Sequence, residues 1–314
     1  MPPAHAAVSV EDVNDTGVSR LPNAVHLSPS HLRSLNTYLS RLPAERVIEW
    51  ALLTFPGVLY QTTSFGPTGS VIIHLVHRAL ARVNEDLARG AHDGETVPTV
   101  GPVPLIFIDT LHHFDETLDL ARRASSKYNV PLLVYKPEGC ETREEFTAKY
   151  GEKLWERQPE SYDFLVKSEP SRRSYVQTGA VAVITGRRRS QRGERDAMPV
   201  VEIEEGSGLV KLNPLAFWTY DQVWEYIKAN DLPYNPLHDR GYKSVGDYHS
   251  TQPTKAGEGE RAGRWRGQEK TECGLHKDYF AQRRKFLEQK KERERQQQLE
   301  AAEKVDAVEV KASA

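Results

Sequence analysis

Residues 58–76, VLYQTTSFGPTGSVIIHLV, contain an apolar strand, a glycine-bearing turn and the start of a long apolar helix. The strand is predicted at Val58–Thr62 and the turn at 63–70, with the helix continuing past Leu75. This order gathers backbone N–H groups at a helix N-terminus, where they can bind a phosphate-like anion. An ordinary strand-to-helix turn has the same pattern, so the stretch alone leaves both interpretations open.

The alternation of strands and helices continues along the chain. Further apolar strands are predicted at 104–109, 131–135 and 180–185, and helices at 115–127, 142–156 and 219–229. This pattern predicts an α/β fold with a mostly parallel, doubly wound sheet. Ligands of such sheets bind outside the carboxyl ends of the strands. The polar residues predicted at those ends are Ser64, Gly66, Asp109 and Gly186 to Arg189.

Composition excludes several classes of protein. The 314 residues carry a formal net charge of −2, so no global basic field would draw the chain to nucleic acid. No apolar run reaches the roughly 18 residues of a membrane span. Two cysteines cannot build a disulfide framework or a four-thiolate cluster site. Their scarcity fits a reducing compartment, and the cytoplasm is the expected location.

Four segments are expected. Residues 1–27 read as a flexible N-terminal arm, 28–249 as the α/β domain, 250–280 as a mobile C-terminal segment, and 281–314 as a charged tail that can form a solvated helix. The stretch from about 241 to 270 is rich in glycine and charge and has few aliphatic residues. It predicts a mobile flap rather than packed structure.

The C-terminal segment carries Lys-Thr-Glu-Cys-Gly-Leu-His at 270–276. Lys270 and His276 each lie three positions from Cys273, and nearby cations favour the reactive thiolate. We interpret Cys273 as a nucleophile. The alternative is a buried structural cysteine, which is how we interpret Cys140.

Basic residues form a second cluster. Five arginines fall between Arg187 and Arg195, directly after the predicted strand at 180–185. Arginine forks match phosphate and sulfate geometry, although solvated charge runs are also common. Asp247 and His249 lie two apart in a predicted loop, but no third metal ligand is evident nearby, so no metal site is expected.

These blocks, in this order, resemble the phosphoadenylyl-sulfate reductase family, the thioredoxin-dependent enzymes of assimilatory sulfate reduction. The resemblance covers about residues 30–280, and Glu-Cys-Gly-Leu-His at 272–276 is its most specific signature. It implies a fold of the adenine-nucleotide alpha-hydrolase-like type. ATP-cleaving relatives carry Ser-Gly-Gly-Lys-Asp-Ser in the first turn. Here the turn reads Ser-Phe-Gly-Pro-Thr-Gly, which fits a turn that only cradles a sulfonucleotide. Supporting blocks lie at 63–66, 107–110, 150–156, 162–163, 167–173, 186–188, 213–214, 234–238 and 241–249.

The resemblance implies a chemistry. Cys273 would attack the sulfur of 3′-phosphoadenylyl sulfate, releasing adenosine 3′,5′-bisphosphate and leaving a cysteine S-sulfonate. Reduced thioredoxin would then release sulfite, for cysteine and methionine biosynthesis. No bound cofactor is implied, and related enzymes are commonly homodimers.

The resemblance also implies the site residues. Glu272 and His276 would support Cys273, and no residue would hold a metal. The substrate-binding candidates are Ser64, Phe65, Gly66, Asp109, Lys167, Arg173, Gly186, Arg187, Arg188, Arg195, Asp247 and His249.

Two alternatives remain. Adenylyl-sulfate reductases resemble this family but add cysteine ligands for an iron–sulfur cluster, which a chain with two cysteines cannot supply. A substrate with a 3′-phosphate is therefore expected. The second alternative is a nucleotide-binding regulator without turnover.

Overall fold

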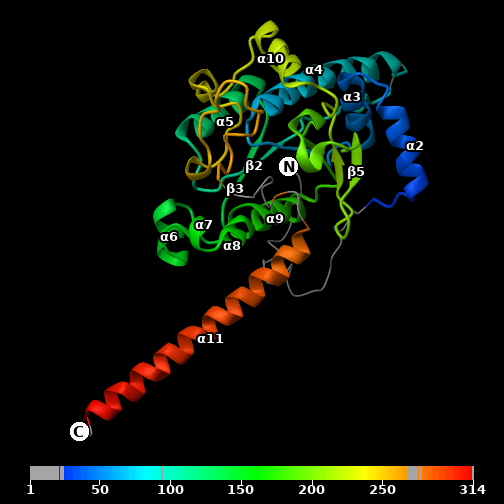
Figure 1. The fold of residues 1–314 in the computed structure, drawn as a ribbon. Helices are drawn as coiled ribbons and strands as arrows, with labels where there is room; N and C mark the ends of the chain where they lie inside the picture. The colour runs from blue at the N-terminus through cyan, green and yellow to red at the C-terminus, as the bar shows by residue number, and fades with distance from the viewer. Residues whose placement is uncertain (1–20, 22–24, 93–94, 268–274, 276–277, 313–314) are drawn as a thin grey trace.

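The computed structural model describes residues 21, 25–92, 95–267, 275 and 278–312, and at its centre lies one six-stranded sheet (Figure 1). The strand order is β3-β2-β1-β4-β6-β5. Neighbouring strands are parallel, except that β5 and β6 pair antiparallel. The predicted mostly parallel α/β fold is confirmed. The strands are β1 (Leu59–Thr62), β2 (Leu105–Ile108), β3 (Leu132–Tyr135), β4 (Ala182–Thr185), β5 (Val201–Ile203) and β6 (Val210–Leu212).

Helices cover both faces of the sheet. In β4, Ala182 and Ile184 belong to the core cluster on one face, and Val183 belongs to the cluster on the other. This alternation follows from the two-residue period of a strand. The first face is covered by α3 (Ala44–Thr54), α4 (Pro67–Gly90), α5 (Asp115–Tyr128) and α10 (Tyr220–Ala229), and the second by α9 (Glu169–Thr178).

The remaining helices are peripheral. They are α2 (Pro29–Leu39), α6 (Arg143–Tyr150), α7 (Leu154–Arg157), α8 (Pro159–Asp163) and α11 (Tyr279–Ala312). The single helix predicted over 142–156 is wrong. Gly151 and Lys153 adopt positive φ angles of 83° and 50°, which end α6 and separate it from α7.

The order of the strands creates a crevice. From β1 the chain steps outward through β2 to β3, and then returns to place β4 on the other side of β1. The loops after β1 and β4 therefore leave the sheet in opposite directions. In open α/β sheets this switch point is where ligands bind, at the carboxyl ends of the strands.

Residues 241–267 are packed, which corrects the expectation of an unpacked flap. Trp265 is only 5% exposed, and its N–H donates to the carbonyl of Ser250 at 2.9 Å. The N–H of Gln252 donates to Gly263 at 2.8 Å, and Tyr248 donates to His112 at 2.9 Å. These backbone hydrogen bonds replace the aliphatic core that the sequence of the segment lacks.

The two ends of the chain also contact the body. Leu21, expected in a flexible arm, is 3% exposed and donates its N–H to Ser207 at 2.9 Å. Helix α11 begins against the body, where Phe286 stacks on Phe164, and then extends away from it (Figure 1). No helix in the described part of the chain is long and apolar enough to cross a membrane.

Candidate active site

A cavity of about 190 Å³ opens at the switch point between β1 and β4. Six parts of the described chain contribute to it: the turn after β1, the end of β2 with the loop that follows, the π-helical turn η1 (Phe164–Ser168), the loop after β4, residues 243–265, and Leu275. Of the sequence-predicted residues, those that line it are Ser64, Gly66, Lys167, Gly186, Arg187, Arg195 and Asp247.

The turn after β1 is held by Phe65. This residue adopts a φ of 56°, a left-handed conformation that is uncommon for any residue with a side chain. Its ring is fully buried and packs edge-on against Phe107 of β2, with 5.3 Å between the ring centroids. The N–H of Phe65 donates to Thr63 Oγ1 at 3.0 Å. Phe65 therefore anchors the turn from beneath and does not line the cavity.

Helix α4 begins at the cavity. Gly66 is its N-cap and has no capping side chain, and Pro67 to Gly69 line the cavity. The free N–H groups and the helix dipole favour an anion there. Gly69 allows the close approach of helix and strand, because a Cβ at this position would lie 2.5 Å from Thr63 Oγ1.

The arginines of the loop after β4 differ in whether their side chains line the cavity. Arg187 and Arg195 line the cavity, where Arg187 pairs with Glu202 and Arg195 contacts Gln191. Arg188 is 1% exposed and does not line the cavity. The expectation that Arg188 contacts the ligand directly is not supported by its position.

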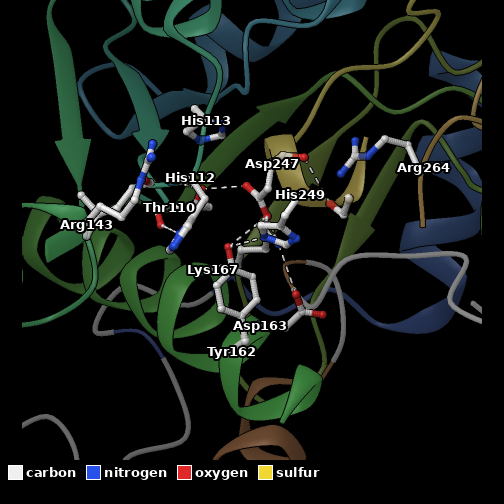
Figure 2. Close-up of polar contacts among 12 residues, drawn as sticks. Thr110, His112, His113, Arg143, Tyr162, Asp163, Lys167, Asp247, His249 and Arg264 are labelled. Atoms are coloured by element: carbon white, nitrogen blue, oxygen red, sulfur yellow. Dashed lines mark hydrogen bonds and ion pairs between the residues drawn. The ribbon is translucent and has the colours of Figure 1, made fainter. Parts of the chain in front are cut away.

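A buried ionic network lies on the opposite wall (Figure 2). Asp247 accepts hydrogen bonds from Lys167 Nζ at 2.7 Å and from Thr110 Oγ1 at 2.7 Å. Lys167 also donates to Asp163 at 3.2 Å. The π-helical turn places Lys167 between these two carboxylates, and such turns are frequent at functional sites.

Aromatic side chains that do not line the cavity pack against this network. Tyr162 Oη donates to Asp247 at 3.4 Å and lies 3.0 Å from His249 Nε2. The His249 ring stacks on Trp155 with 4.1 Å between centroids. Burial, with the carboxylates of Asp247 and Asp163, raises the pKa of Tyr162 well above its ordinary value, so the phenol stays a hydrogen-bond donor.

Asp247 itself stays ionised. Burial raises the pKa of this carboxyl, but the Lys167 ammonium, with smaller contributions from His113 and His249, more than offsets burial. The net pKa lies well below the ordinary value. Asp247 lines the cavity as a paired carboxylate, and His249 stands behind it.

Two predicted residues lie elsewhere. Arg173 pairs with Glu169 at 2.8 Å, donates to the carbonyl of Lys136, and sits outside the cavity. Asp109 accepts the N–H of Leu111 at 2.9 Å and so shapes the loop after β2. Neither side chain lines the cavity.

Several lining residues were missed by sequence reasoning. Because 241–270 was interpreted as a flap without packing, only Asp247 and His249 of this segment were assigned to the site. The basic spacing in Glu-Arg-Ala-Gly-Arg-Trp at 260–265 was the available signal. The missed polar and aromatic residues include His113, Gln191, Lys243, Glu260, Arg261, Arg264 and Trp265.

Of the two cysteines, only Cys140 lies within the described residues. Cys140 is 1% exposed, and burial raises the pKa of its thiol, as expected of a structural cysteine. Cys273, Glu272 and His276 lie outside the described residues. Leu275, two positions after Cys273, is described and lines the cavity.

The cavity therefore suits an anionic ligand. A helix N-terminus and basic side chains converge on it, and backbone donors and arginines both bind phosphate and sulfate groups. Within the described part of the chain, no group of three or more His, Cys, Asp or Glu side chains is arranged to hold a metal ion.

Comparison with known proteins agrees with this geometry. The phosphoadenosine phosphosulfate reductase domain matches residues 58–253, more than half of the chain. The chain therefore belongs to the phosphoadenosine phosphosulfate reductase family of enzymes.

Individual relatives support the assignment. The chain is 47% identical over 277 residues to a phosphoadenosine phosphosulfate reductase of Emericella nidulans, covering 87% of this chain and 84% of that protein. It is 37% identical over 247 residues to an adenosine 5′-phosphosulfate reductase of Halalkalibacterium halodurans, covering 78% and 96%. The crystal structure of the phosphoadenylyl-sulfate reductase from Candida auris, a phosphate complex, is similar with a TM-score of 0.62 and 45% identity, covering 73% of this chain and 100% of that one.

Proposed function

We propose that the chain reduces 3′-phosphoadenylyl sulfate to sulfite and adenosine 3′,5′-bisphosphate, with Cys273 as the nucleophile and reduced thioredoxin as the electron donor. One observation carries the proposal. Leu275 lines the same cavity as the N-terminus of α4 and the arginines of the loop after β4. Covalent geometry keeps residues two positions apart within about 7 Å of each other between Cα atoms. An anion in the cavity is therefore within reach of the cysteine segment.

The first step is a transfer of the sulfonate group. The Cys273 thiolate attacks sulfur, the S–O bond to the 5′-phosphate breaks, and the bisphosphate leaves with the bonding electrons. Negative charge shifts onto the leaving phosphate, where the N–H groups of Gly66, Thr68 and Gly69 and the arginine side chains can stabilise it. A thioredoxin thiolate then attacks Cys273 Sγ, the S–S bond to the sulfonate breaks, and sulfite leaves with the bonding electrons. The second thioredoxin thiol attacks the resulting mixed disulfide, which oxidises thioredoxin to a disulfide and returns the Cys273 thiolate.

The proposed substrate carries a 3′-phosphate, and no iron–sulfur cluster takes part. The supporting observation is the cysteine count, since two cysteines cannot supply four thiolates. A reducing compartment, such as the cytoplasm, would keep Cys273 a thiol. We also retain a homodimer as a prediction.

The proposal is tested by measuring sulfite release from each sulfonucleotide, with and without reduced thioredoxin. Turnover is expected with 3′-phosphoadenylyl sulfate plus thioredoxin, and only a stoichiometric protein adduct without thioredoxin. A preference for adenylyl sulfate would contradict the assignment of the substrate. Binding of adenosine 3′,5′-bisphosphate with no turnover of either substrate would identify a nucleotide-binding regulator instead.

A further inference from the structure

Glu260 and Arg188 form an ion pair that joins the packed 241–267 segment to the loop after β4. The two carboxylate oxygens of Glu260 each accept a hydrogen bond from Arg188 Nη2, both at 2.8 Å. Glu260 also accepts from Gln191 at 3.3 Å and lines the cavity. A carboxylate that lines an anion-binding cavity opposes its ligand by charge alone, so its presence calls for another role.

Arg188 connects Glu260 to the rest of the site. Its Nε donates to Thr68 Oγ1 in the first turn of α4 at 2.9 Å, and its Nη1 donates to Ser190 Oγ at 2.6 Å. Each nitrogen of the guanidinium therefore has a protein acceptor. The arginine is a fixed buried junction between α4, the loop after β4 and Glu260, and its fork geometry makes the junction directional.

We propose that Glu260 is a positioning residue: through Arg188 it holds the 241–267 segment on the loop after β4 and so fixes Arg261 and Arg264 at the cavity. Arg261 follows Glu260 directly, and Arg264 bridges to Thr251 through the backbone. Both arginines line the cavity. This inference concerns the same site as the proposed function, and the test by nucleotide binding below rests on that function.

The chain offers a matched control. Glu258 pairs with Arg266 through both oxygens, at 2.9 Å and 2.7 Å. It lies in the same segment, two positions away, but it does not line the cavity and is more exposed than Glu260. Glu258→Gln and Glu260→Gln therefore remove the same charge from the same segment in different places.

The test is the affinity for adenosine 3′,5′-bisphosphate, measured by calorimetry. Removing a negative charge beside an anion site should tighten binding if charge alone matters. Loss of positioning should instead weaken it, and we expect about a tenfold weakening for Glu260→Gln. Glu258→Gln should stay within about twofold. Equal or tighter binding by Glu260→Gln would overturn the proposal.

Hydrogen exchange of the ligand-free protein provides a second, independent arm. The amides of Gln252 and Trp265 donate hydrogen bonds within the segment. Their exchange rates should be higher than in wild type for Glu260→Gln and equal to wild type for Glu258→Gln. Unchanged exchange in Glu260→Gln would overturn the inference. If Glu260→Gln shows faster exchange but the wild-type protein binds no adenosine 3′,5′-bisphosphate, the ion pair between Glu260 and Arg188 has the proposed positioning role and the proposed function is rejected. If Glu260→Gln fails to fold, Glu260→Asp keeps the charge but shortens the reach, and it should show the same weakening to a smaller degree.

Discussion

Lys167 and Asp247 are joined by a 2.7 Å ion pair although 80 residues separate them in the sequence. The lysine comes from a π-helical turn and the aspartate from the segment that was expected to be an unpacked flap. Both line the cavity, and Asp247 is 1% exposed. The pair therefore fixes the late segment of the chain onto the α/β body and sets the position of a cation at the site.

Asp247→Asn should destabilise the protein by about 3 kcal/mol at pH 7, because the buried Lys167 ammonium loses the nearer of two carboxylate partners and keeps Asp163. The lowered pKa of Asp247 means that its stabilisation is present above the ordinary carboxyl pKa of 3.8 and is lost as the pH falls below it. The difference in urea unfolding between wild type and Asp247→Asn should therefore be constant from pH 7 to pH 5 and shrink below about pH 4. Asp119→Asn, which removes an exposed ion pair with Arg123, should change stability by less than about 1 kcal/mol. An equal loss in both variants would contradict the assigned role of Asp247.

Arg195 and Arg173 should differ in their effects on ligand binding. Arg195 lines the cavity, and Arg173 lies outside it beside Glu169. Arg195→Gln should weaken the binding of adenosine 3′,5′-bisphosphate about tenfold through the loss of a charge-assisted contact. Arg173→Gln should leave the affinity within about twofold. Calorimetry at two salt concentrations measures both, and a comparable loss in Arg173→Gln would show that the cavity is misassigned.

Gly69→Ala should destabilise the protein by about 1–3 kcal/mol, since the new Cβ would overlap Thr63 Oγ1. It should also weaken nucleotide binding, because the strain falls on the turn that presents the N-terminus of α4. The double variant Thr63→Ala/Gly69→Ala removes the clashing oxygen and should recover part of the stability. Thermal unfolding of the two single variants and the double variant checks this, and additive losses would contradict it.

Leu21→Ala should lower sulfite turnover without changing nucleotide affinity. Leu21 is buried in the hydrophobic cluster against which Leu275 packs. Truncating Leu21 therefore weakens the packing of Leu275, which lies two positions from Cys273. Leu39→Ala provides the control, since Leu39 is equally buried but belongs to a different cluster. Both changes should cost about 2–4 kcal/mol of stability. The rate of single-turnover sulfonate transfer should fall only in Leu21→Ala. An equal fall in both variants would show that the effect comes from general destabilisation and would contradict the specific role of Leu21.

The sequence was sufficient for the sheet and for its ligand-binding edge, because apolar strands and glycine-bearing turns are local signals. Ser64, Gly66, Gly186 and Arg187 were predicted at that edge and line the cavity. Local signals could not separate Arg187 from Arg188, since the direction of each side chain depends on a partner far along the chain, Glu202 for one and Glu260 for the other.

The packing of 241–267 was also beyond local reasoning. Few aliphatic residues usually indicate a mobile loop, but here buried polar and aromatic contacts do the packing. Asp247 is held by Lys167 and Thr110, and Trp265 is buried beside the cavity. Such contacts leave no periodic pattern, and only the folded arrangement reveals them.

The most direct test is to incubate the protein with 3′-phosphoadenylyl sulfate in the absence of thioredoxin and to locate the adduct by peptide mass spectrometry. One sulfonate per chain is expected, on Cys273, and it should be released as sulfite when reduced thioredoxin is added. The buried Cys140, whose thiol pKa is raised, should remain unmodified. An adduct on Cys140, no adduct on Cys273, or full turnover by a Cys273→Ser variant would contradict the role of Cys273 as the nucleophile.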